Sequence, residues 1–111
     1  MKPDTRYEYD GDPASQPLLG AALKCVIDPE MALDVVELGL IYRVEAAPEA
    51  TRVRLTMTSP ACPVAEHIVE EVGHAVRAAR PDCPVDVELV WDPPWTPDRM
   101  SDCARSAMGW E

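Results

Sequence analysis

One amphipathic run constrains the fold more than any other part of the chain. Residues 63–80, PVAEHIVEEVGHAVRAAR, repeat apolar side chains at spacings of three and four, which predicts a helix with one buried face. The apolar positions are Val64, Ala65, Ile68, Val72, Val76 and Ala79. Acidic residues gather in the first half, and Arg77 and Arg80 in the last turns, as the helix dipole favours. Such a helix needs an apolar surface to pack against.

Runs of alternating apolar and polar residues, before and after this helix in the sequence, are predicted to supply that surface. Residues 52–58, RVRLTMT, place Val53, Leu55 and Met57 on one face of a strand, opposite the arginines and threonines. Residues 84–91, PVDVELVW, alternate in the same way. The β-branched and apolar run at 34–46 indicates another extended segment, broken near Gly39. The turn signal PEAT joins 34–46 to 52–58, so we expect a hairpin.

Two more helices are expected towards the ends. Apolar spacing predicts one from Leu18 to Ile27, stopped at Asp28 because the residue before Pro29 disfavours the α conformation. After a rigid loop, Thr96 resembles an N-cap with Pro97 in the first helical position. The face of this last helix would carry Met100, Cys103, Ala104, Ala107 and Met108.

The predicted order is therefore α-β-β-α-β-α, in an α+β fold of two layers. A small, mostly antiparallel or mixed sheet would be covered by helices on one face. Residues 1–16 are polar and rich in Pro, Gly and Asp, so we expect a disordered acidic tail. Residues 17–111 would form a single domain, which suits a chain of 111 residues.

Charge and cysteine usage narrow the function classes. A net charge of −10 disfavours nucleic acid and anionic membranes as partners. No apolar run approaches the roughly 20 residues of a membrane span, and the N-terminus resembles no targeting peptide, so a cytoplasmic protein with reduced thiols is expected. The four cysteines form no C-x-x-C pair, so a self-contained zinc site is not expected. Cys25 and Cys103 are predicted to lie in the core.

Cys62 is the main candidate for chemistry. In TSPACP, residues 58–63, Pro63 fits the first helical position and leaves Cys62 at the N-cap. Unpaired backbone N–H groups and the helix dipole favour the thiolate there, whereas Glu66 opposes it. The thiolate could bind iron, carry sulfur or attack an electrophile. The alternative is a cysteine that only caps the helix or packs under a loop.

Other polar groups permit two interpretations each. Asp28 and Glu30, in DPE, could sit beside Cys62 as acceptors or metal ligands, although a Pro-containing turn is the simpler account. A shared helix face carries His67, Glu71 and His74. These side chains could bind a metal, although a face exposed to solvent is the more common arrangement. Trp91 and Trp95 flank the sequence DPP, where Trp95 could fill a cleft or cover the core.

With these residues in view, the chain resembles the SufT- and PaaD-like iron–sulfur cluster assembly domains. The segments that carry the resemblance are DPE at 28–30, LGLIY at 38–42, TSPACP at 58–63 and DPPWTPDRMS at 92–101. The family signature pairs Asp-Pro-Glu with Thr-x-x-x-Cys-Pro, and Asp-Pro-x-Trp also matches. Together the segments extend the resemblance over residues 18–111.

The resemblance implies a compact α/β domain that acts in the maturation of iron–sulfur proteins. By resemblance, Cys62 is the essential thiol and a partial metal ligand, Asp28 and Glu30 are its acidic neighbours, and Thr58 shapes the loop. Pro63, Asp92 and Trp95 complete the matched motifs. PaaD-like members accompany an oxygenase complex and carry a Cys-rich C-terminal extension. Because this sequence ends at Glu111, a stand-alone SufT-like domain is the expectation.

Three functional hypotheses follow. In the first, Cys62 transiently binds iron or a cluster, and a second copy, a scaffold or a client apoprotein supplies the remaining ligands. In the second, the chain is an adaptor that docks clients onto a scaffold. In the third, it is a thiol enzyme, for which His67 is poorly placed as a base. An accessory, non-enzymatic role is expected.

Overall fold

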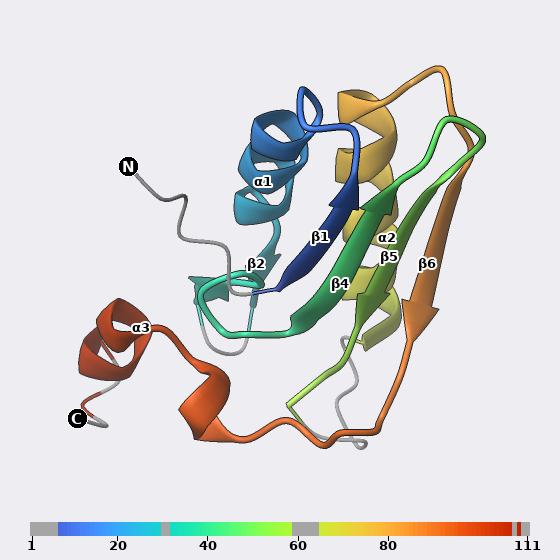
Figure 1. Ribbon diagram of the computed structural model, residues 1–111. Helices are drawn as coiled ribbons and strands as arrows, with labels where there is room; N and C mark the ends of the chain where they lie inside the picture. The colour runs from blue at the N-terminus through green and yellow to red at the C-terminus, as the bar shows by residue number, and fades with distance from the viewer. Residues whose placement is uncertain (1–6, 30–31, 59–64, 108, 110–111) are drawn as a thin grey trace.

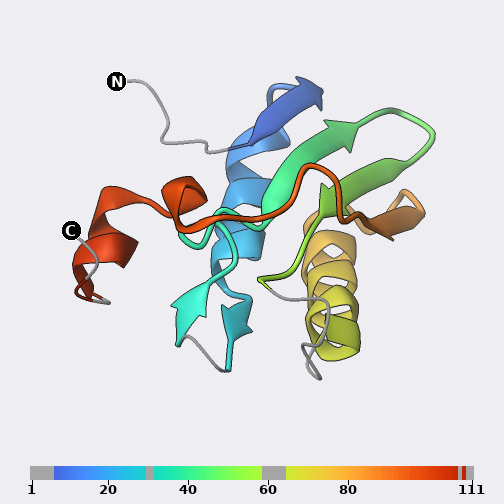
Figure 2. The same ribbon diagram turned by 90° about the horizontal axis from the view of Figure 1, so that it is seen from below.

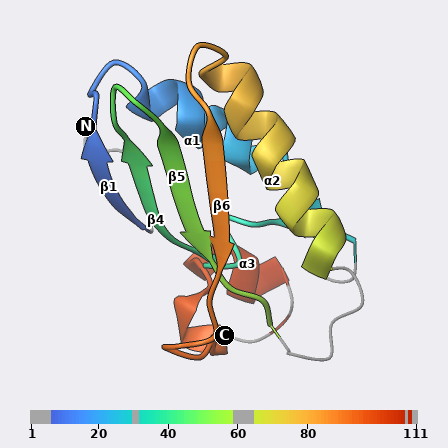
Figure 3. The same cartoon turned by 90° about the vertical axis from the view of Figure 1, so that its right-hand side faces the viewer.

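The computed structural model describes residues 7–29, 32–58, 65–107 and 109. Its main sheet has the order β1-β4-β5-β6, formed by Glu8–Gly11, Ile41–Ala46, Thr51–Leu55 and Val85–Leu89. Helices α1 (Gln16–Lys24) and α2 (Ala65–Ala79) cover one face of this sheet (Figures 1 and 3). The predicted two-layer α+β architecture is confirmed.

The sheet is mixed. Strands β4 and β5 form the predicted antiparallel hairpin, with an irregularity in register between Ile41 and Arg43. Strand β6 pairs parallel with β5, and α2 makes the crossover between them. On the other side, β1 pairs parallel with β4. A separate two-stranded hairpin, β2 (Ile27–Asp28) with β3 (Leu33–Asp34), lies between α1 and β4 in sequence.

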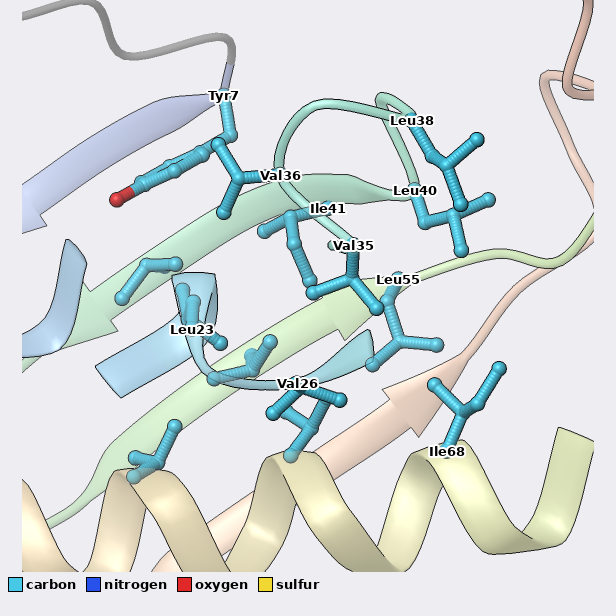
Figure 4. Packing of buried hydrophobic residues seen from close by; sticks show 14 of the residues in the cluster. Tyr7, Leu23, Val26, Val35, Val36, Leu38, Leu40, Ile41, Leu55 and Ile68 are labelled. Atoms are coloured by element: carbon cyan, nitrogen blue, oxygen red, sulfur yellow. The ribbon is translucent and has the colours of Figure 1, made fainter. Parts of the chain in front are cut away.

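Apolar side chains from both layers form the core (Figure 4). Val53, Leu55 and Met57 are buried, as the alternation in 52–58 predicted. They pack in one cluster with Ile68, Val72 and Val76 from α2. Without phenylalanine, the core depends on branched aliphatic side chains and methionine. Among the described residues, no helix is long and apolar enough to cross a membrane.

The expected disordered tail is wrong for residues 7–16. Strand β1 aligns Glu8 with Arg43 and Gly11 with Ala46, and the Asp12 N–H donates to the Ala46 carbonyl at 3.1 Å. Tyr7, directly before this strand, is buried in the core cluster. The segment looks polar because β1 is an edge strand whose Glu8 and Asp10 side chains are exposed. Residues 1–6 lie outside the described structure.

Both predicted terminal helices differ in their bounds. Helix α1 ends at Lys24, and Cys25 is its exposed C-cap rather than part of the core. Its buried residues are Leu19 and Leu23, which lie four positions apart on one face of the helix.

The C-terminal helix is split in two. Thr96 begins a 3₁₀ turn, η1 (Pro97–Arg99), with Arg99 N–H donating to the Thr96 carbonyl at 3.0 Å. The α-helix, α3 (Asp102–Ala107), starts later, and Ser101 Oγ accepts from the Ala104 N–H at 3.0 Å as its N-cap. This shift in phase leaves Cys103 exposed, contrary to the prediction, although Met100 and Ala104 are buried.

The sheet face away from the helices is charged. Strand register aligns two rows of four side chains across it: Glu8, Arg43, Arg54 and Glu88 in one, and Asp10, Glu45, Arg52 and Asp86 in the other. Arg43 bridges to Glu8 at 3.1 Å and to Asp10 at 3.3 Å. Arg54 bridges to Glu88 at 3.2 Å. The first row is balanced, whereas the second has one arginine against three carboxylates.

Candidate functional site

Two of the four sequence motifs pack against each other. The segment 92–101, which we call the strap, lies along the turn that precedes β4. The Trp95 indole N–H donates to the Leu38 carbonyl at 2.7 Å, and Arg99 Nε donates to the Gly39 carbonyl at 2.8 Å. The Ser101 N–H donates to the Glu37 carbonyl at 2.9 Å. The strap is thus fixed by backbone groups of 37–39.

Tyr42 adds a second level of contacts to the strap. The guanidinium carbon of Arg99 lies 4.2 Å from the centroid of the Tyr42 ring, within cation–π range. The Tyr42 hydroxyl donates to the Pro93 carbonyl, in the loop that contains the cis Asp92–Pro93 bond. The sequence pattern did not single out Tyr42 or Arg99 individually. The sequence indicated only that Tyr42 lies in the motif at 38–42 and Arg99 in the motif at 92–101.

This packing lies at the carboxyl end of β5. The Thr56 N–H donates to the Leu40 carbonyl, and the Val90 N–H donates to the Leu55 carbonyl, both at 2.8 Å. Thr56 is fully buried, and its hydroxyl has no hydrogen-bond partner in the described part of the chain. Thr58 is half-buried at the end of this extension. The chain therefore leaves β5 beside the base of the strap.

Cys62 and Pro63 lie outside the described residues, between Thr58 and the first turn of α2 at Ala65. In the sequence, Cys62 follows the end of β5 at Leu55 and precedes the start of α2 at Ala65. The proposed N-cap geometry stays a prediction.

The acidic motif divides in the same way. Asp28 is 1% exposed, in β2, and its carbonyl accepts from the Ala32 N–H at 2.8 Å. Ala32 closes this turn with φ of 58°, a left-handed conformation unusual for alanine. Glu30 lies outside the described residues. The β2–β3 hairpin and the N-terminal end of α2 lie on the same side of the molecule (Figure 2). A contact between Asp28 and Cys62 stays a prediction.

The remaining candidates lie apart from this region or at its surface. Asp92 is exposed, and Trp95 is half-buried against the core. His67, Glu71 and His74 are all exposed, as expected of a solvated helix face. In the described part of the chain, no three His, Cys, Asp or Glu side chains are grouped to hold a metal ion. Cys83 donates from Sγ to the Pro48 carbonyl at 3.5 Å.

The mixed sheet, its two covering helices and the packed motif pair define a small two-layer α+β domain. The family model described as iron–sulfur cluster assembly protein matches residues 19–88. The chain belongs to this family, and its resemblance to the SufT- and PaaD-like domains is confirmed.

Named relatives cover most of the chain. An Fe-S protein maturation auxiliary factor, YitW, from Bacillus subtilis is 43% identical over 89 residues, which is 79% of this chain and 87% of that protein. The Fe-S protein maturation auxiliary factor SufT from Staphylococcus aureus is 43% identical over 85 residues, or 76% of this chain and 97% of that protein.

A solved structure shares the fold. It is a domain of unknown function from Bacillus anthracis, with a TM-score of 0.80 and 40% identity. The alignment covers 88% of this chain and 94% of that one.

Proposed function

We propose that this protein is an auxiliary factor in the maturation of iron–sulfur proteins, and that Cys62 is its working thiol. The observation that carries the proposal is the similarity to two maturation auxiliary factors, at 43% identity over more than three quarters of this chain. The chain aligns with 87% and 97% of those proteins, so the comparison concerns nearly whole proteins rather than a shared fragment.

The chemistry of the proposal rests on a thiolate at a helix start. A thiolate is the form of cysteine that binds iron, and N-cap positions lower a thiol pKa. Asp28, a buried residue of β2, is the proposed acidic neighbour. Thr58 ends the extension of β5 and is proposed to set the entry to the loop.

One thiolate cannot complete the coordination of a cluster. Iron–sulfur clusters are commonly held by four cysteine ligands. In the proposal, Cys62 holds iron or a cluster in transit, and a client apoprotein, an assembly scaffold or a second copy supplies the other ligands. The cluster is cargo rather than a resident cofactor, and the role is accessory rather than enzymatic.

Anaerobic reconstitution tests this function. The reduced protein is incubated with iron and sulfide, alone and with the apo form of a cluster-dependent enzyme. We expect visible cluster absorption and transfer to the enzyme with the native chain, and loss of both with Cys62→Ser. Cys103→Ser is the matched control, because Cys103 is an exposed thiol elsewhere on the chain. Cluster transfer that survives in Cys62→Ser would contradict thiol carriage and support an adaptor.

A further inference from the structure

Strand β6 ends the sheet beside a groove. It is the last strand in the order β1-β4-β5-β6, and Figure 3 shows it at the margin of the sheet with α2 to its right. Between the strand and the helix lies a groove of about 290 Å³. Apolar groups of Val69, Gly73, Val85 and Val87 line it, with Glu70, His74 and Arg77 also contributing.

Backbone groups of β6 face outward at alternate positions. The Val90 N–H donates to the Leu55 carbonyl, and the Pro84 carbonyl accepts from the Thr51 N–H, so even-numbered positions bond to β5. Since both backbone groups of a strand residue point to the same side and alternate along it, Val85 and Val87 direct theirs to the free edge. These same residues direct their side chains into the groove.

The charge at this edge is negative and incompletely paired. Asp86 and Glu88 project onto the open face of the sheet, beside the edge. Glu88 is bridged by Arg54, whereas Asp86 forms no ion pair among the described residues. Asp86 belongs to the row in which Arg52 is the sole cation against three carboxylates.

We propose that the free edge of β6 and its groove bind an extended segment of a partner protein, with apolar residues alternating with lysine or arginine. Strand addition of this kind uses backbone hydrogen bonds for affinity and side-chain pockets for specificity. The apolar side chains of the segment would enter the groove, and its basic side chains would lie beside Asp86 and Glu88.

Charge also disfavours a second copy paired by two-fold symmetry about Val87. A two-fold antiparallel pairing of β6 centred on Val87 would align Asp86 of each copy with Glu88 of the other. Like charges directly opposite each other destabilise a strand pair. A basic segment relieves the same carboxylates instead.

The site also has a suitable location. Because β5 and β6 run parallel, the carboxyl end of β6 lies beside the end of β5 that leads to Thr58. A segment bound along β6 would extend towards that end of the sheet. Binding itself requires neither iron nor Cys62, so this proposal can fail or succeed independently of the proposed function.

The first test needs no ligand. By amide hydrogen exchange in the free protein, Val85 and Val87 should exchange quickly, and Asp86 and Glu88 slowly. A synthetic peptide of alternating valine and arginine, long enough to span Val85–Leu89, should then protect Val85 and Val87. Protection of both amides before peptide is added would overturn the proposal, as would an unchanged exchange pattern after it.

Variants separate the parts of the site. Val87→Pro removes an outward N–H without removing a bond to β5, and should weaken peptide binding about tenfold or more. Asp86→Lys should weaken it about fivefold. His67→Ala, on an exposed part of α2 outside the groove, is the matched control and should bind normally.

Two further outcomes bear on the proposal. Equal affinity for a valine–glutamate peptide would overturn the assigned partner chemistry. Cys62→Ser should bind the peptide with full affinity, and Val87→Pro should still reconstitute the cluster. Peptide binding and cluster carriage can therefore fail independently. Thermal unfolding of each variant verifies that the fold persists.

Discussion

Gly39 lies against the backbone of Arg99 so closely that a β-carbon on Gly39 would come within 2.2 Å of the Arg99 carbonyl oxygen. Gly39 also has φ of 75°, in the left-handed region that side chains disfavour. Two sequence motifs, 38–42 and 92–101, therefore meet at a point where only a hydrogen atom fits. The position of the strap depends on this contact.

Gly39→Ala should destabilise the protein by about 3 kcal/mol or more, because overpacking and left-handed strain both act at this position. Urea unfolding measures the change. Gly73→Ala, in α2, is the control, and it should change stability in the opposite direction. The added β-carbon would meet only Val87 Cγ2, at 3.8 Å. This substitution should raise the free energy of unfolding by about 0.5–1 kcal/mol. Equal effects of the two substitutions would contradict the proposed contact.

Trp95→Phe should cost about 1–2 kcal/mol of unfolding free energy, because it leaves the buried Leu38 carbonyl without its donor at 2.7 Å. Denaturant unfolding followed by far-UV circular dichroism provides the measurement. Trp91→Phe, at a side chain that is 44% exposed, should change stability by less than about 0.5 kcal/mol. If both substitutions prove neutral, the indole bond does not hold the strap.

The pKa of Asp12 is lowered from 3.8, mainly by the hydrogen bond from Ser15 Oγ and next by the Ala14 N–H. A carboxyl whose pKa is lowered on folding stabilises the protein above pH 3.8. This contribution is lost as the pH falls through the pKa of the folded state. Ser15→Ala should raise the Asp12 pKa and reduce this acid-dependent loss. Carboxyl titration by NMR and urea unfolding above and below 3.8 measure both effects.

Ser15→Thr retains the hydroxyl and is the control for that experiment. It should keep the Asp12 pKa low. An Asp12 titration that does not move in Ser15→Ala would show that another group lowers the pKa.

Cys62 should alkylate with a pH midpoint well below the value of about 8.5 for a free thiol. Peptide mass spectrometry assigns the rate of each cysteine in the reduced native protein. Cys25 and Cys103 are internal controls, because both are exposed and accessible to the reagent. A midpoint for Cys62 no lower than theirs would contradict activation by the helix N-terminus and favour the adaptor role.

Sequence periodicity predicted the elements that alternate or repeat strongly. The hairpin at β4 and β5, helix α2 and strand β6 were found because each buries one face. Strand β1 was missed because an edge strand with Glu8 and Asp10 on its open face looks like a polar tail. Cys25 and Cys103 were misplaced because periodicity does not fix where a helix ends or changes phase.

The candidate site was only partly accessible to the same reasoning. Motif order pointed to the strap and to the 38–42 segment, but it did not reveal that they bind each other. The hydrogen bond from Trp95 to the Leu38 carbonyl, for example, joins residues that are 57 positions apart in the sequence. Long-range hydrogen bonds of side chains to backbone leave no periodic pattern in sequence, so Tyr42 and Arg99 required the structure.

The placement of β1 has a practical consequence for anyone who trims this protein. The family model begins at residue 19 and ends at 88, so a fragment with those limits would lack β1, the strap and α3. Strand β4 would then lose one of its two neighbours, β1, and Arg43 would lose Glu8 and Asp10. The exposed edge of β4 would then be open to pairing with another copy of the fragment. The residues matched by the family model are thus fewer than those that build the sheet.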